Sequence, residues 1–121
     1  MSDIQMPLIK DRFRGFLPVV VDIETGGFNC HTDALLEMAI TQLAMNEQGE
    51  LVIEATHSRN IEPFEGANLD PAALEFTGID PENPLREAVP EAIALGELFS
   101  IIRLSVKENQ CNRAVLVGHN A

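Results

Sequence analysis

The chain has 121 residues, of which 45% are hydrophobic, and a formal net charge of −11. This length suits one globular domain with a modest core and is too short for two ordinary domains. No apolar run approaches the roughly 18 residues that cross a bilayer, and the first residues lack a signal-peptide core, so we expect a cytoplasmic protein without a membrane partner. Cys30 and Cys111 have no metal-ligand spacing and predict no disulfide framework.

Residues 1–16 are predicted to form an N-terminal arm. Its second half alternates the cations Arg12 and Arg14 with the aromatic rings of Phe13 and Phe16. This pattern suits contact with a phosphate backbone and unstacked bases, or a segment that packs Phe13 on the body. Six of the eight cations lie in the arm or near the end of the chain, which predicts basic patches on an acidic body, with a solvated face as the alternative.

The apolar run that follows the arm predicts a strand at the centre of a sheet. Three consecutive valines, bounded by Pro18 and by Gly26-Gly27, favour a short strand that is buried on both faces. Side chains alternate along a strand, so Asp22 and Glu24 share a face with Cα atoms roughly 6.5 to 7 Å apart. Their mutual repulsion favours a hard divalent cation such as Mg²⁺ or Mn²⁺. The alternative is a solvated strand end at which both carboxylates cap the glycine turn.

The strand is predicted to end in a tight turn at Gly26-Gly27-Phe28-Asn29. Because these glycines lack side chains, a substrate backbone could come close to them. No Gly-Lys-Ser/Thr follows, so the turn does not support binding of a nucleoside triphosphate. Phe28 could stack on the terminal base of a single strand, or could pack into the core.

The remaining elements predict an α/β fold. Two strand-like runs, 35–45 and 51–61, are joined by a polar connector that ends at Gly49, as in a hairpin. Asp70 and Pro71 fit the start of a short helix over 71–77, and a long helix is expected from Pro90 to about Asn109. A buried parallel strand over 114–118 would complete a mixed sheet of three antiparallel strands, a crossover helix and a fourth strand. The long helix should pack on the sheet through Ala92, Leu95, Phe99, Ile102 and Val106.

Several of these segments resemble one known family. The run from Val19 to Gly26 is similar to the first motif of the DnaQ-like (DEDD) 3′–5′ exonucleases, which have a ribonuclease H-like fold. Further matches to that superfamily lie at 35–39, 77–79 and 118–121. Within it, the chain is most similar to the ribonuclease T family, through segments 11–16, 62–64, 66–69 and 111–114.

The resemblance implies a metal-dependent 3′–5′ exoribonuclease that trims single-stranded 3′ ends of tRNA and other small structured RNAs, with single-stranded DNA as a further substrate. It implies two Mg²⁺ ions, with Mn²⁺ as an alternative, held in part by Asp22 and Glu24 as catalytic residues. It also implies a homodimer, in which cations of one subunit meet the active site of the other. The residues that the resemblance assigns to substrate binding are Thr25, Gly26, Phe28, Phe76, Arg12, Arg14, Lys107 and Arg113.

The family's later metal-binding aspartates and its catalytic histidine follow the motif at 118–121 and are not among these residues. We therefore expect residues 1–121 to be the N-terminal part of a single exonuclease domain, with a sheet that is incomplete at its C-terminus and no activity alone. Ala72 replaces a base-reading glutamate of the family, which leaves the base preference open. The alternatives are a proofreading-type DNA exonuclease and a non-catalytic binding or dimerisation fragment. A haloacid-dehalogenase-like phosphatase fits poorly, because it needs Asp-x-Asp.

Overall fold

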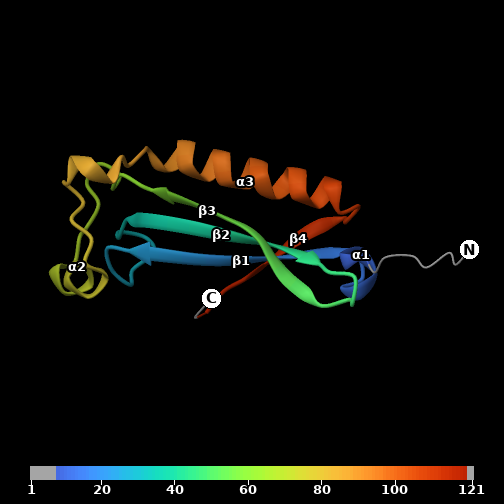
Figure 1. Cartoon of the computed structure of the whole chain (residues 1–121). Helices are drawn as coiled ribbons and strands as arrows, with labels where there is room; N and C mark the ends of the chain where they lie inside the picture. The colour runs from blue at the N-terminus through green and yellow to red at the C-terminus, as the bar shows by residue number, and fades with distance from the viewer. Residues whose placement is uncertain (1–7, 120–121) are drawn as a thin grey trace, which may run out of the picture. The chain divides into compact units, whose positions relative to one another are not determined.

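The computed structural model describes residues 8–119. Residues 1–7 of the predicted arm and the last two residues of the 118–121 motif lie outside this range. None of the helices described between residues 8 and 119 is both long and apolar enough to span a membrane. The elements in chain order (Figure 1) are helix α1 (Ile9–Arg12), strands β1 (Phe16–Thr25), β2 (Leu35–Met45) and β3 (Leu51–Asn60), helix α2 (Pro71–Thr77), the 3₁₀ turn η1 (Pro84–Arg86), helix α3 (Glu91–Glu108) and strand β4 (Arg113–Val117).

The four strands form one mixed sheet in the order β3-β2-β1-β4. β2 and β3 form the predicted hairpin, in which the Asn46 amide donates to the Glu50 carbonyl at 3.0 Å and Gly49 takes the positive φ of 77° that the turn requires. β1 and β2 point in opposite directions in Figure 1, and β4 pairs with β1 in parallel, from Phe16 opposite Arg113 to Val20 opposite Val117. The predicted topology, with β1 inside the sheet, is confirmed.

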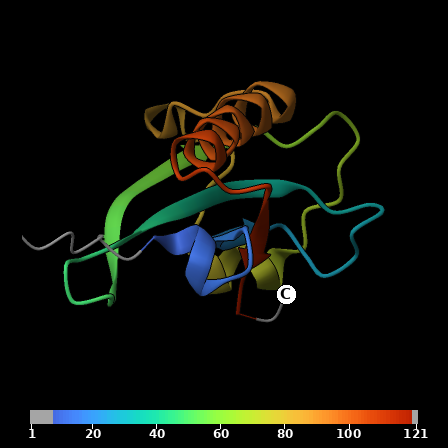
Figure 2. The same ribbon diagram turned by 90° about the vertical axis from the view of Figure 1, so that its right-hand side faces the viewer.

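The chain folds as two compact units, each with its own core. Of the described residues, the first unit contains 8–21, 40–57 and 99–119, and the second contains Asp22–Ala39 and Ser58–Leu98. Figure 2 looks along α3 and shows this helix on one side of the strands. The buried apolar side chains of the first unit are Ile9, Leu17, Val19, Ile40 and Ile102. Those of the second unit are Ala34, Leu36, Met38, Ile61, Ala94 and Leu98.

For the described residues, the predicted burial of β1 on both faces and the predicted burial of β4 are wrong. In β1 the Leu17 and Val19 side chains are 1% exposed, whereas Phe16 and Val20 on the other face are 39% and 38% exposed. β4 is an edge strand, and its apolar residues Val115, Leu116 and Val117 are between 43% and 51% exposed. An apolar strand is buried on both faces only where another layer of the fold covers each face of its sheet. In the described residues, only the face with Leu17 and Val19 is covered.

The buried stripe of α3 is displaced from the predicted one. The fully buried positions are Ala94, Leu98, Ile102 and Ser105, whereas the predicted Ala92 is exposed. Apolar residues surround much of this helix, including the exposed Ile93 and Leu104, so their spacing alone did not identify the face that packs.

The described part of the predicted arm, residues 8–16, contains the short helix α1. Ile9 in α1 is 3% exposed and belongs to the first core, and the chain then turns through Arg14 and Gly15, both with positive φ. The Gly15 amide donates to the Lys10 carbonyl at 2.7 Å, and β1 starts at Phe16. The segment is therefore anchored to the body, and Arg12 and Arg14 remain exposed on it.

Candidate active site

The last residues of β1, in the second unit, carry the two predicted catalytic carboxylates. β1 continues to Thr25, so Asp22 and Glu24 project from the same face of an extended chain and Ile23 from the other. Asp22 is exposed and Glu24 is partly buried. The two carboxylates are thus neighbours that water and a ligand can reach.

Neither carboxylate forms a salt bridge with a basic side chain of residues 8–119. The one salt bridge found among residues 8–119 joins Arg59 to Glu97, at 3.5 Å. Two unpaired acids on one strand face suit a hard divalent cation, which prefers oxygen ligands and keeps several waters. The described residues form no cluster of three or more His, Cys, Asp or Glu side chains that could hold a metal. A metal site at this position would need further ligands besides Asp22 and Glu24.

The turn after β1 is held together by its own backbone. The Gly26 amide donates to the Ala34 carbonyl at 2.8 Å, and the Gly26 carbonyl accepts from the Asp70 amide at 2.7 Å. A Cβ at Gly26 would lie 2.8 Å from Leu69 Cδ2, so the Leu69 side chain would have to shift to accommodate a larger residue. The approach of a substrate backbone to this turn remains a prediction, and the space beside Gly26 is shared with the Leu69 side chain. The Thr25 hydroxyl donates to the Gly27 carbonyl at 2.7 Å.

Two aromatic rings of the second unit point into solvent. Phe28 on the turn is 100% exposed, so the alternative of a core residue is wrong, and Phe76 on α2 is 91% exposed. α2 forms as predicted, since the Asp70 side chain accepts from the Ala72 amide at 3.0 Å and Gly78 ends the helix with a φ of 73°. Burial of a phenylalanine side chain contributes about 1.5 to 3 kcal/mol, so two exposed rings are not explained by stability.

Sequence reasoning missed a hydrogen-bonded centre at Asp33. Its carboxylate accepts from the Asn29 amide at 2.8 Å, from the Asn68 side-chain amide at 2.9 Å and from the Thr32 hydroxyl at 2.9 Å. The bond from Asn68, followed by that from Asn29, lowers the pKa of Asp33 below its usual 3.8. The sequence contained one local signal for this centre, an aspartate four residues after an asparagine in a loop. It gave no signal for the other partner, Asn68, which is distant in sequence.

The four cations assigned to substrate binding all lie in the first unit. Arg12, Arg14, Lys107 and Arg113 are exposed. Two segments that carry them are in contact, because the Asn112 amide donates to the Gly15 carbonyl at 2.7 Å and Lys10 Nζ donates to Gln110 Oε1 at 3.1 Å. The Arg12 guanidinium also lies 5.1 Å from the centroid of the Phe13 ring. The first unit therefore presents a basic surface, defined here as the exposed cations of residues 10–14 and 107–113.

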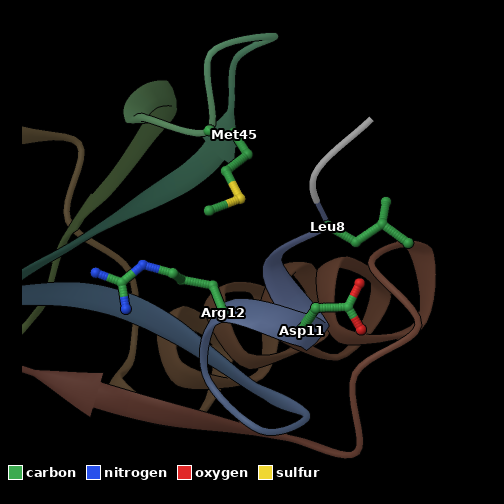
Figure 3. A pocket seen from close by; sticks show the side chains of 5 residues that line it. Leu8, Asp11, Arg12 and Met45 are labelled. Carbon is green, nitrogen blue, oxygen red and sulfur yellow. The ribbon is translucent and has the colours of Figure 1, made fainter. Parts of the chain in front are cut away.

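Beside α1, the first unit has an open depression of about 300 Å³. In Figure 3, Met45 points into it from the end of β2, and the Arg12 and Asp11 side chains leave α1 in opposite directions. Its lining residues are Leu8, Asp11, Arg12, Met45 and Gly49, which lack the paired carboxylates expected at a metal site.

The chain is similar to known nucleases. A family model described as an exonuclease matches residues 19–121. Ribonuclease T of Hahella chejuensis is 66% identical over 95% of this chain and 52% of its own length, and ribonuclease T of Photorhabdus laumondii is 57% identical over 100% of this chain and 56% of its own. The chain thus spans about half the length of these relatives.

Among solved structures, Escherichia coli exonuclease I in complex with a dT13 oligonucleotide matches 87% of this chain and 20% of its own, with a TM-score of 0.64 and 17% identity. That similarity confirms the ribonuclease H-like α/β fold. The match to the family model and the identity to these relatives together show that the chain belongs to the exonuclease family.

Proposed function

We propose that the protein to which this chain belongs is a metal-dependent 3′–5′ exoribonuclease that trims single-stranded 3′ ends of tRNA and other small structured RNAs. The observation that carries the proposal is the pair of carboxylates, Asp22 and Glu24, on one face at the end of β1, neither of which forms a salt bridge within residues 8–119. The ribonuclease T relatives support RNA as the substrate, and the solved complex of exonuclease I with a dT13 oligonucleotide makes single-stranded DNA a further candidate.

Asp22 and Glu24 would hold Mg²⁺, or Mn²⁺ in its place. A pair of such ions stabilises the attacking and leaving oxygens of a phosphodiester displacement and lowers the pKa of a bound water. In this chain, Asp22 and Glu24 supply negative oxygen ligands at a position that solvent reaches. Because residues 8–119 hold no cluster of three or more His, Cys, Asp or Glu side chains, further ligands and the general base would come from elsewhere in the protein.

The other residues of the second unit would position the terminal nucleotide. The exposed rings of Phe28 and Phe76 are available to stack on bases, a contact worth about 1 to 3 kcal/mol per base and tolerant of sequence. Thr25 lies directly after Glu24, and its hydroxyl oxygen can still accept a hydrogen bond from a ribose. The Gly26 amide and carbonyl are already hydrogen-bonded within the chain, so Gly26 would hold the turn beside the substrate rather than bond to the substrate itself.

The basic surface of the first unit would bind the phosphate backbone upstream of the cleaved end. Arg12, Arg14, Lys107 and Arg113 are exposed and belong to segments in contact with one another. We further propose that the protein acts in the cytoplasm as a homodimer, in which this surface serves the partner's active site. Sedimentation of the full-length protein with and without an oligonucleotide would measure its oligomeric state, and a monomer in both would contradict the dimer.

The activity is tested on the full-length protein with a 5′-labelled RNA hairpin that has a short single-stranded 3′ overhang. We expect stepwise shortening from the 3′ end in Mg²⁺, none in a chelator, and none by the Asp22→Ala, Glu24→Ala double variant. Glu62→Ala, which removes an acid elsewhere in the second unit, is the matched control and should trim normally. Equal trimming by the double variant would contradict the proposal, and a DNA hairpin of the same sequence measures the preference for RNA.

A further inference from the structure

The exposed ring of Phe28 lies on a loop that contributes few apolar contacts of its own. Residues 28–32 are all exposed, and a large side chain on such a loop loses rotamer and backbone freedom when it binds a ligand. A ring that stacks well on a base must therefore be held by something other than burial. The Asp33 carboxylate accepts three hydrogen bonds that restrain this loop.

Asp33 joins two segments that are far apart in sequence. One carboxylate oxygen accepts from the backbone amide of Asn29, next to Phe28, and the other accepts from the side-chain amide of Asn68. Two backbone bonds reinforce this junction, from the Asn68 amide to the Thr32 carbonyl at 2.8 Å and from the Asp70 amide to the Gly26 carbonyl at 2.7 Å. Both segments belong to the second unit.

The second of these segments leads directly into α2, which carries Phe76. Asp70 is both a member of the junction, through its amide, and the N-cap of α2, through its side chain. The close packing extends to Gly27, where an added Cβ would collide with the Asp33 carboxylate. The Phe28 loop and the start of α2 are thus one hydrogen-bonded body, with an exposed ring at each end.

We propose that Asp33 is a positioning residue that fixes the Phe28 loop to the start of α2, so that Phe28 and Phe76 meet the 3′-terminal nucleotides as one preformed clamp. The inference rests on the proposed function, since it assumes that the rings stack on a nucleic acid. Asp33 itself touches neither the metal ligands nor the rings in the contacts that the structure provides. Its effect is on the entropy that the loop loses when substrate binds.

The test compares Asp33→Asn with wild type in the full-length protein, alone and combined with Phe28→Ala. An asparagine accepts through only one of its two terminal atoms, so it can keep the bond from the Asn29 amide only if its N–H faces Asn68, whose side-chain amide must then turn to accept; the negative charge of the acceptor is lost in either case. We expect the KM for a short single-stranded RNA to rise about tenfold, with kcat within about twofold. Phe28→Ala should weaken binding about tenfold in wild type and less than about threefold with Asp33→Asn, because the ring is then no longer held.

Asp80→Asn is the matched control. Asp80 also accepts from a backbone amide in the second unit, that of Glu82 at 3.1 Å, but it joins no distant segments. It should leave KM and the effect of Phe28→Ala unchanged. Should Asp33→Asn fail to fold, Asn68→Ala removes the side-chain bond from Asn68 to Asp33, leaves the backbone bonds between the two segments in place, and carries the same expectation.

Binding is also measured by fluorescence anisotropy of a labelled oligonucleotide in a chelator, so that cleavage does not contribute. If Phe28→Ala costs the same factor with and without Asp33→Asn, or if kcat falls with KM unchanged, the inference is overturned while the proposed function stands. If the wild-type protein neither binds nor trims, the proposed function fails, and the inference fails with it.

Discussion

The two units of this chain differ most in charge. The second unit contains thirteen acidic residues and two cations, so the whole net charge of −11 belongs to it. The described part of the first unit contains six cations and five acidic residues, a balance near neutrality. On the proposed function, the basic surface of the first unit would attract a polyanionic substrate, and the acidic second unit would repel it unless cations neutralise it. The proposed site in the acidic unit would therefore need metal ions, whereas the basic surface would act through its own arginines and lysine.

The largest effect should come from removing one carboxylate of the proposed metal site in the acidic unit. Asp22→Asn or Glu24→Gln should lower the trimming rate by on the order of 10³-fold or more, about 4 kcal/mol, because a metal ligand is lost. The free energy of unfolding should change by less than about 0.5 kcal/mol, since Asp22 is exposed and has no partner within the described residues. Kinetics and thermal unfolding on the same samples measure both, and a large loss of stability would assign these residues a structural role.

A smaller effect is expected from the exposed rings. Phe28→Ala and Phe76→Ala should each weaken binding of a single-stranded oligonucleotide by about 1 to 3 kcal/mol, the value of one stacked base. Because Phe28 is 100% and Phe76 is 91% exposed, neither change should lower the melting temperature. Phe64→Ala, at a ring of the second unit that is 43% exposed, is the control. If it weakens binding as much, the loss does not report stacking at Phe28 and Phe76.

The basic surface should be recognised by its response to salt. Replacing Arg12, Arg14, Lys107 and Arg113 with alanine should reduce the slope of log K against log salt by about 0.7 for each phosphate contact that is lost. Arg59→Ala is the matched control, because Arg59 belongs to the acidic unit and pairs with Glu97. A slope that falls equally in the control would show that the cations act through total charge rather than as a surface.

The smallest expected effect is the loss of the stability contributed by the Asp33 hydrogen bonds at low pH. The hydrogen bonds to Asp33 lower its pKa below 3.8, so the stability they give is complete above about pH 4 and is lost as the pH falls through the lowered value. The amide signal of Asn29 should follow this titration in NMR spectra, with a midpoint below 3.8, and the change should be absent in Asp33→Asn. A midpoint at or above 3.8 would contradict the hydrogen bonds described for the loop.

The sequence predicted the elements well because their signals are local. The Asp70-Pro71 start and Gly78 end of α2, the turn at Gly49 and the valines of β1 are each read from a few neighbouring residues. The paired carboxylates were predictable for the same reason, since alternation along one strand places Asp22 and Glu24 together.

What could not be predicted depends on contacts between distant segments. The partner of Asp33 is 35 residues away, and no local rule selects Asn68 from the other polar loop residues. The burial of β4 was overestimated because an apolar strand does not reveal which of its faces is covered. The buried face of α3 was predicted incorrectly because apolar residues surround the helix. The neighbouring strands decide which of these residues pack.

The most direct test of the metal site is paramagnetic broadening by Mn²⁺ in NMR spectra of the full-length protein. We expect substoichiometric Mn²⁺ to broaden first the amide signals of Asp22, Ile23 and Glu24, and this selective broadening to disappear in the Asp22→Asn, Glu24→Gln double variant. If the ion instead broadens other acidic segments of the second unit first, and the double variant behaves as wild type, the end of β1 is not a metal site.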